Sequence, residues 1–338
     1  MQRMLWAALT AFAVSLIIGP TVIKLLTKLK IGQQVYSKAP ETHKAKQGMP
    51  TMGGLMFAII SVALAFTFRT GSFQWKSDIP AAIALFAILN LAMGFADDFL
   101  KIRRKANQGG LSEKQKTIGQ IIVAAAFSWY CWRHPDIGSS IRLPFITTEF
   151  NLSWAYIPVM TFVIYCTLNA ANLLDGLDGL LASVSICMFA TFGIFALMFA
   201  GQMGASQTQA QTINIATMCA ALTGAMMGYL RYNAYPAQMM MGDTGSMYIG
   251  AVFVAVGMAI RVPLWIPFAG VMMVVSLVST FAQRMYFKAT HGKRIFKNSP
   301  YHHHLEMMGM AESRIVSMYV LITVLFCMLC FLALPLKV

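Results

Sequence analysis

Acidic residues are scarce in this sequence, and several of them stand in short clusters. Only 12 of the 338 residues are Asp or Glu, yet Asp97 and Asp98 are adjacent at the end of the apolar run LNLAMGFADD. Asp175 and Asp178 follow in NLLDGLDGL, Asp243 follows in MMMGDTGSM, and SPYHHHLEMM adds three histidines and a glutamate. Mg²⁺ prefers one or two carboxylates together with substrate phosphates. These residue types therefore suit phosphoryl transfer, which depends mainly on positioning and charge neutralisation.

Each cluster also has a structural explanation. The pair at Asp97 and Asp98 could be a solvated helix end, and DGLDG could be either a tight glycine turn or a helix with Asp175 and Asp178 on one face. GDTGS resembles an ordinary helix start whose small residues let helices approach closely, and the triple histidine could be a surface tract or a chance metal site. Function is favoured because all four clusters are expected at one membrane surface, where ionisable groups are costly and usually functional.

Composition indicates a membrane protein. Apolar residues make up 58% of the chain, charged residues make up 11%, and the mean hydropathy is +0.64, which is too apolar for an ordinary soluble domain. The net charge of +14 does not indicate nucleic-acid binding, because the bases lie between apolar segments and no recognisable binding module is present. The sequence also has no Walker loop, which argues against a nucleotide hydrolase that drives transport.

A window of about 19 residues predicts ten segments that are long enough, or nearly so, to cross a bilayer as helices. We therefore expect an all-α fold in a single membrane domain, since a helix satisfies the backbone polar groups that lipid cannot. No small-residue cleavage pattern follows the first segment, so it is interpreted as a span and not as a signal peptide. The predicted spans are 4–27, 55–69, 79–96, 118–133, 153–170, 179–200, 213–230, 246–261, 264–284 and 315–336.

Lysine and arginine residues concentrate in every second connection between these spans. The loops after the first, third and ninth spans are basic, whereas the connections on the opposite side hold few bases and 201–212 holds none. By the positive-inside rule the basic side is cytoplasmic, so both termini are predicted to be periplasmic and the number of spans to be even. The predicted cytoplasmic loops lie near 28–54, 97–117, 171–178, 231–245 and 285–314.

Motifs spread along nearly the whole chain resemble those of one known family. They are PTMGG at 50–54, ADDFLK at 96–101, NLLDGLDGL at 172–180, YNAYPA with MGDTGS at 232–246, and GKRIF with PYHHHLE at 292–306. In this order they resemble the bacterial phospho-N-acetylmuramoyl-pentapeptide transferases, also called translocase I. The HHH-x-E segment discriminates best, because the sister transferases that use UDP-N-acetylglucosamine carry a differently arranged histidine motif.

The resemblance implies an enzyme of the bacterial inner membrane that acts in peptidoglycan synthesis. It would transfer phospho-MurNAc-pentapeptide from UDP-MurNAc-pentapeptide to undecaprenyl phosphate at the cytoplasmic face, giving lipid I and UMP with Mg²⁺ as cofactor. A homodimer through membrane helices is a further family expectation. A related UDP-N-acetylglucosamine transferase would share the aspartate clusters. A secondary transporter, the alternative from another class, would place ionisable groups near mid-span, where this sequence has almost none.

The positions of this sequence that match the family's motifs indicate which residues would form its site. The resemblance implies that Asp243 and Asp98 bind Mg²⁺ and that Asp97 acts on the lipid phosphate, as a base or, in an alternative mechanism, as a nucleophile. It also implies that His302 lies at the catalytic centre. The residues implied in substrate binding are Lys46, Thr51, Lys101, Lys105, Lys116, Asn172, Asp175, Asp178, Asn233, His303 and His304.

Direct attack by the lipid phosphate is the mechanism that we favour over a covalent aspartyl intermediate. The lipid phosphate is already largely ionised, so it needs little from a base beyond orientation. A few positions depart from the family pattern: Met49 and Leu174 stand where threonine is usual, and the pair Met239 and Met240 stands where one residue is usually aromatic. If that aromatic stacks on uracil, Met240 offers a softer thioether contact in its place.

Overall fold

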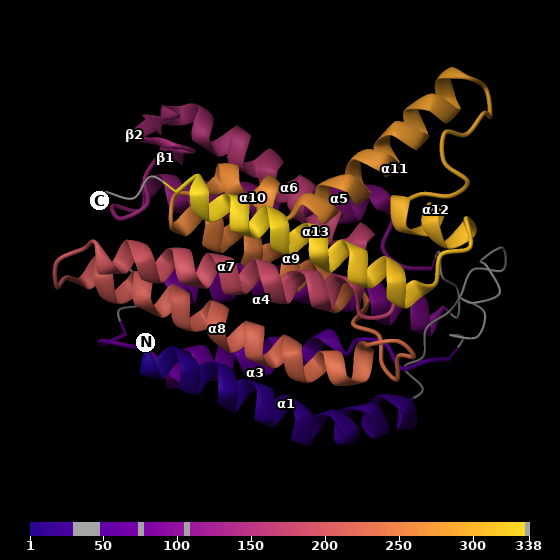
Figure 1. Ribbon diagram of the computed structural model, residues 1–338, viewed down its shortest axis with the longest axis horizontal. Coiled ribbons are helices and arrows are strands. Elements are labelled where there is room, and N and C mark those ends of the chain that lie inside the picture. Colours follow the sequence, from indigo (N-terminus) through magenta and orange to yellow (C-terminus); the bar gives the residue numbers. More distant parts are fainter. Residues whose placement is uncertain (30–47, 74–77, 105–108, 335–338) are drawn as a thin grey trace.

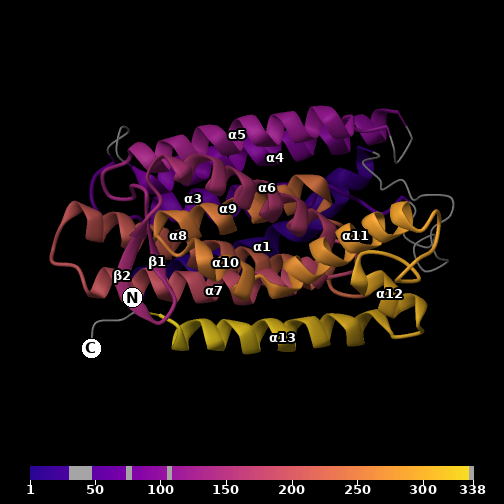
Figure 2. The same cartoon turned by 90° about the horizontal axis from the view of Figure 1, so that it is seen from above.

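A computed structural model describes residues 1–29, 48–73, 78–104 and 109–334, and it is built almost entirely of helices that run side by side along one axis (Figure 1; Figure 2). A short antiparallel hairpin of β1 (Ser140–Leu143) and β2 (Ile146–Asn151) was not among the predicted elements. The helices are α1 (Gln2–Lys28), α3 (Gly54–Thr67), α4 (Ile79–Arg103), α5 (Glu113–Arg133), α6 (Tyr156–Leu174), α7 (Leu180–Gly201), α8 (Gln207–Asn233), α9 (Gly242–Ala259), α10 (Ile266–Ala269), α11 (Val271–Ala289), α12 (Tyr301–Met307) and α13 (Glu312–Leu332), with 3₁₀ turns η1 (Ser153–Ala155) and η2 (Pro263–Trp265).

Each of the ten predicted spans overlaps a helix. Among the described residues, six helices are long and apolar enough to cross a membrane, and a bent helix pair gives a seventh candidate. The helix α3 is apolar but only 14 residues long, and α5 and α9 also fall outside this set. The chain is therefore an all-α polytopic membrane protein with one small hairpin.

The segment predicted as a single span at 264–284 is broken in the structure. Pro263–Ala269 and Val271–Ala289 meet at an angle of 80°, and α11 projects away from the other helices in Figure 1. Gly270 lies at the break, where its N–H donates to the carbonyl of Ile266 at 2.9 Å. A Cβ at this position would lie only 2.9 Å from the same carbonyl oxygen, so glycine permits the sharp bend.

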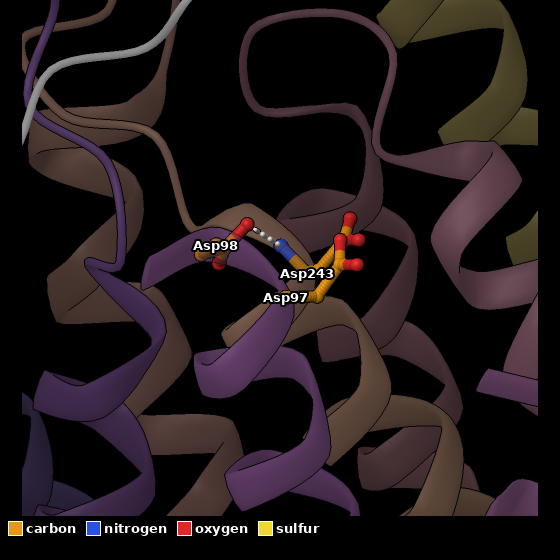
Figure 3. Close-up of side chains that lie close together, drawn as sticks. All are labelled: Asp97, Asp98 and Asp243. Atoms are coloured by element: carbon orange, nitrogen blue, oxygen red, sulfur yellow. Dashed lines mark hydrogen bonds between the residues drawn. The ribbon is translucent and has the colours of Figure 1, made fainter. Parts of the chain in front are cut away.

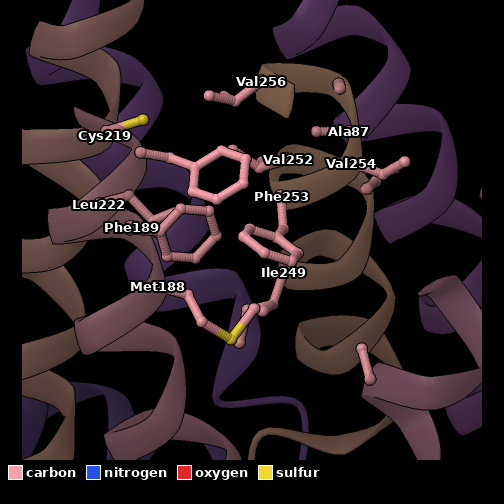
Figure 4. Packing of buried hydrophobic residues seen from close by; sticks show 14 of the residues in the cluster. Ala87, Met188, Phe189, Cys219, Leu222, Ile249, Val252, Phe253, Val254 and Val256 are labelled. Carbon is pink, nitrogen blue, oxygen red and sulfur yellow. The ribbon is translucent and has the colours of Figure 1, made fainter. Parts of the chain in front are cut away.

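The helix α9 is the buried centre of the bundle. Every residue from Thr244 to Ala259 is buried, and α3, α4, α6 and α7 pack around it. Phe253 of α9 lies against Phe189 of α7, with ring centroids 6.1 Å apart (Figure 4). The ring of Phe192, also on α7, lies 4.8 Å from that of Phe253. A helix enclosed on all sides cannot shift without disturbing its neighbours. The residues at its first turn are therefore held in fixed positions.

Glycines bring α3 and α4 against the first turn of α9. A Cβ on Gly94 of α4 would overlap the backbone carbonyl of Asp243, and a Cβ on Gly54 of α3 would overlap the backbone of Gly245. This is the close helix approach that the small residues of GDTGS predicted. It fixes the end of α4 against the beginning of α9.

The helix α1 begins, and α13 ends, at the same end of the bundle (Figure 1). The hairpin and the connection from α7 to α8 also lie at this end. The connections from α4 to α5, from α6 to α7, from α8 to α9 and from α11 to α13 lie at the opposite end.

A buried ionic contact holds the beginning of α4. One carboxylate oxygen of Asp78 accepts a hydrogen bond from the Ala81 N–H at 3.0 Å, and the other lies 2.5 Å from Arg69. We expect Asp78→Ala to lower the free energy of unfolding by about 3 kcal/mol, because it removes a helix cap and leaves the half-buried Arg69 without its carboxylate partner. Thermal unfolding in detergent measures this loss. The exposed acid in the first turn of α5 supplies the control, Glu113→Ala; equal shifts in both variants would contradict the prediction.

Candidate functional site

Three aspartates from two helices meet at the end of the bundle that lies opposite the termini. Carboxylate oxygens of Asp97, Asp98 and Asp243 lie within 4.8 Å of one another. Figure 3 shows the carboxylates of Asp97 and Asp243 side by side, while Asp98 approaches the first turn of α9. The helix α4 continues to Arg103, so Asp97 and Asp98 lie within it, and the loop expected to begin at residue 97 is shorter than predicted.

The carboxylate of Asp98 caps the amino-terminal end of α9. It accepts hydrogen bonds from the Thr244 N–H at 2.9 Å, from the Thr244 hydroxyl at 2.7 Å and from the Asp243 N–H at 3.3 Å. The first N–H groups of a helix have no partner inside it, so this contact joins α4 firmly to α9. A carboxylate offers about four acceptor positions, so Asp98 retains capacity for a cation.

Two lysines and an asparagine surround Asp243. Lys101 lies 3.0 Å from its Oδ2 and 2.6 Å from Asp97, and Lys116 lies 2.8 Å from the same Oδ2. The Asn172 amide donates to Oδ1 at 2.6 Å and to the Ser246 hydroxyl at 3.0 Å. Burial alone would raise the pKa of Asp243, but Lys116 and Lys101 outweigh burial and hold this pKa well below its usual value. Asp243 is therefore ionised at neutral pH.

The described end of the loop between α4 and α5, residues 109–112, covers Asp97. Its Oδ1 accepts a hydrogen bond from the Leu111 N–H at 2.8 Å, and Arg104 donates to the carbonyls of Gly109 and Gly110 at 3.0 and 3.4 Å. Leu111 acts through its backbone, so no side-chain pattern could have identified it. Thr244 and Ser246 were also missed as site residues. Their position in the GDTGS segment, beside Asp243, was the available signal.

The DGLDG segment forms a turn between α6 and α7, so the turn interpretation is correct and the helical one is wrong. The helix α6 ends at Leu174, and Gly179 precedes α7 with a φ of 73°, a backbone conformation that favours glycine. Asp178 is buried and accepts a hydrogen bond from the Ala237 N–H at 2.9 Å. The turn that also holds Asp175 is therefore bound to the segment leading into α9.

Asn233 stabilises the other end of that segment. Its side-chain amide donates to the carbonyl of Met239 at 2.9 Å, and it is buried at the end of α8. The N–H of Met240 in turn donates to the carbonyl of Pro50 at 2.8 Å. These contacts hold residues 234–241 between α8 and the segment that precedes α3, close to the first turn of α9.

The three histidines lie on α12, and α12 lies against the 175–179 turn. His302 is fully buried, and a Cβ on Gly176 would overlap its imidazole and lie 3.0 Å from His303. His303 contacts Glu306 at 3.1 Å, and His304 accepts a backbone hydrogen bond from the preceding loop at 3.1 Å. The histidines thus border the same turn as Asp175, as neighbours of the aspartate cluster.

Thr51 lies beside the cluster at the left-handed residue Gly242, whose φ is 70°. A Cβ on Gly242 would lie 2.5 Å from Asp98 Oδ2 and 2.8 Å from Thr51 Oγ1, so only glycine fits there. The predicted residues Lys46 and Lys105 fall outside the described residues. The structure brings together Thr51, Asp97, Asp98, Lys101, Lys116, Asn172 and Asp243, and it places Asp175, Asp178, Asn233, His302, His303 and His304 on the adjoining segments.

Comparison with known proteins places this chain in a family. Residues 80–261 match the model described as Glycosyl transferase family 4. Over 335 residues the chain is 42% identical to the phospho-N-acetylmuramoyl-pentapeptide-transferase of Clostridium novyi (strain NT), an alignment that covers 99% of this chain and 98% of the relative. The protein with that name in Clostridium perfringens (strain SM101 / Type A) is 38% identical over 333 residues, covering 98% and 97%. Its counterpart in Thermoanaerobacter sp. (strain X514) is 38% identical over 335 residues, covering 99% of both chains. The chain belongs to the phospho-N-acetylmuramoyl-pentapeptide-transferase family, within glycosyl transferase family 4.

Proposed function

We propose that this chain transfers phospho-MurNAc-pentapeptide from UDP-MurNAc-pentapeptide to undecaprenyl phosphate, giving lipid I and UMP. Relatives named for this transferase align with almost the whole chain. The observation that carries the proposal is the meeting of Asp97, Asp98 and Asp243 with Lys101 and Lys116 at one end of a membrane bundle. These groups come from three helices, and no packing requirement explains why so many charges should gather there.

The aspartate cluster suits Mg²⁺. Three carboxylates offer oxygens within 4.8 Å of one another, and Mg²⁺ is bound in proteins by one or two carboxylates with water and substrate phosphates. We assign Asp243 and Asp98 as its ligands, as the resemblance implies: Asp243 is ionised, and Asp98 keeps acceptor capacity beyond its hydrogen bonds to Thr244. Bound there, the ion would neutralise charge on the transferring phosphate.

The remaining residues of the cluster would position the two phosphates. We assign phosphate contacts to Lys101 and Lys116, whose ammonium groups flank Asp243, and Asn172 would hold the Asp243 carboxylate in place. An oxygen of the lipid phosphate then attacks the phosphorus attached to the sugar, and the bond from that phosphorus to UMP breaks. Asp97 would orient the attacking phosphate and accept any proton that it still carries. No aspartyl phosphate forms in this scheme.

We assign the donor to the surface made by the 175–179 turn, residues 234–241 and α12. Asp175, Asp178 and Asn233 would line the nucleotide side together with Thr51. His302 would border the reacting phosphates, and His303 and His304 would hold α12 in position. The contact of His302 with Gly176 supports this assignment, because it joins α12 to the turn that follows Asn172. Lys46 and Lys105 remain predictions.

An apolar groove of about 210 Å³ offers a route for the lipid tail. It lies between α6, α9 and the bend before α11, and its lining includes Phe162, Cys166, Ala170, Phe253 and Met273. On α6 this lining ends close to Asn172, so a polyprenyl chain in the groove would have its phosphate near the cluster. Cross-linking of a photoreactive lipid exclusively to the predicted periplasmic loops would contradict this route.

We further propose ten membrane spans, with both termini in the periplasm and the site at the cytoplasmic face of the inner membrane. The helix α1 begins, and α13 ends, at one end of the bundle, and the aspartate cluster lies at the other end. The described residues of the basic connections that follow α4 and α11 lie at the same end as the cluster. Pairing of two copies through membrane helices remains a prediction.

Lipid-dependent release of UMP tests the proposed function. Purified protein given UDP-MurNAc-pentapeptide and undecaprenyl phosphate should release UMP, and EDTA should lower the rate by at least about 100-fold until Mg²⁺ is restored, because the phosphates then lack neutralisation. Omission of the lipid and replacement of the donor by UDP-N-acetylglucosamine are the controls. Release only from UDP-N-acetylglucosamine would move the chain to the sister transferases, and no release from either donor would reopen the transporter alternative.

A further inference from the structure

A basic pocket of about 310 Å³ lies between α11 and the loop that leads to α12. Arg284 and Lys288 line it from α11, and Arg294, Asn298 and Ser299 line it from the loop. Among the described residues that line the pocket, none carries a carboxylate. Three cations with amide and hydroxyl groups therefore form a site suited to an anion.

The wall of this pocket is fixed by a buried side chain. The Gln283 amide oxygen accepts hydrogen bonds from the N–H groups of Ile295 and Phe296 at 3.0 and 2.9 Å. Gln283 is only 8% exposed, so it binds the loop to the body of α11. Arg294, which directly precedes Ile295, lines the pocket from this loop, and its guanidinium donates to the Lys297 carbonyl at 3.2 Å.

The same loop leads directly to the surface that we assign to the donor. Ser299 lines the pocket, and the Tyr301 N–H donates to the Ser279 hydroxyl of α11 at 3.1 Å. The next residue is His302, which lies against Gly176 in the turn between α6 and α7. Part of a donor bound at that turn could therefore extend along α12 into the basic pocket.

The proposed donor carries an anion that suits this position. Its pentapeptide is joined to the muramoyl group through the amino end, so the free end of the peptide is a carboxylate. An extended pentapeptide spans about 17 Å, which lets its free end lie well away from the reacting phosphates. The aspartate cluster would repel this carboxylate, whereas Arg284, Lys288 and Arg294 would attract it.

We propose that this pocket binds the carboxylate end of the donor's peptide, chiefly through Arg284 and Arg294. The inference rests on the proposed function and adds a specificity site to it. A guanidinium group presents paired N–H donors that match a carboxylate, so one arginine on α11 and another on the loop would select for a negative charge there. The pocket is small for a ligand site, which suits the end of a peptide and not the whole donor.

A matched pair of donors tests this proposal: UDP-MurNAc-pentapeptide and the same molecule with a carboxamide at the peptide's free end. The double variant Arg284→Gln, Arg294→Gln should raise the KM for the carboxylate donor about tenfold, with little change in kcat and little change in the KM for the carboxamide donor. Lys293→Gln is the control, because it removes a charge from the same loop outside the pocket lining. Calorimetric titration with each donor, without the lipid acceptor, should show the same difference.

The remaining outcomes would contradict either this proposal or the proposed function. Equal KM changes for both donors, or no change for either, would overturn the proposal. An effect that appears only in vesicles containing phosphatidylglycerol, and not in phosphatidylcholine alone, would also overturn it and assign the pocket to lipid headgroups. No UMP release by the wild type from either donor would instead reject the proposed function. If the double variant melts at a lower temperature, Lys288→Gln makes the same comparison with a smaller change.

Discussion

Replacement of Asp243 by asparagine should reduce lipid-dependent UMP release by at least about 10³-fold while the protein stays folded. The Asp243 carboxylate accepts from Lys101, Lys116 and Asn172 at 3.0, 2.8 and 2.6 Å. Asparagine is neutral, and its amide nitrogen can only donate, so that nitrogen would face groups that also donate. The variant would lose both the charge that holds a cation and the acceptor that positions the two lysines.

The measurement is the initial rate of UMP release with both substrates saturating, together with the melting temperature. Glu113→Gln is the matched control, because Glu113 is an exposed acid at the same end of the bundle, in the first turn of α5. Binding of Mn²⁺, followed by electron paramagnetic resonance, should weaken in Asp243→Asn and not in the control. A folded variant that keeps more than a tenth of the wild-type rate would refute the proposal that Asp243 holds the cation and positions the two lysines.

The convergence of the aspartates could be predicted from the sequence because charge is costly in lipid. Asp97, Asp98 and Asp243 stand at ends of apolar segments, and the positive-inside rule assigns those ends to one side. The length of α4 could not be predicted in this way. Hydropathy locates apolar residues, but α4 continues past residue 96 to Arg103, where an ion pair between Asp97 and Lys101 one turn apart supports polar turns.

Other features depend on packing or on the backbone. The break at Gly270 was missed because glycine and proline are tolerated within membrane helices, so their presence alone does not indicate a bend. Asp97 is held by the N–H of Leu111, and a backbone donor leaves no mark in a sequence. The hairpin, in contrast, could have been predicted from the sequence. Its second strand, ITTEFN at Ile146–Asn151, is rich in β-branched residues, and that signal was present.

Gly94→Ala is expected to lower both stability and activity, although alanine favours a helix more than glycine does. Gly94 lies one turn before Asp97 and Asp98 on α4, and an added Cβ would overlap the carbonyl of Asp243. That carbonyl belongs to the first turn of α9, the helix enclosed by α3, α4, α6 and α7. The helix α4 would therefore have to move, which would separate Asp98 from its hydrogen bonds to Thr244.

We expect Gly94→Ala to lower the rate of UMP release at least about tenfold and to lower the free energy of unfolding by about 1–3 kcal/mol, the usual cost of overpacking. Helix propensity alone predicts a gain of about 1 kcal/mol, so the sign of the stability change separates the two effects. Gly119→Ala on α5 is the matched control, because its Cβ would meet only the flexible Met93 sulfur, at 3.2 Å, and the Met93 methyl. If Gly94→Ala is as stable and active as Gly119→Ala, close packing of α4 on α9 does not position the aspartates.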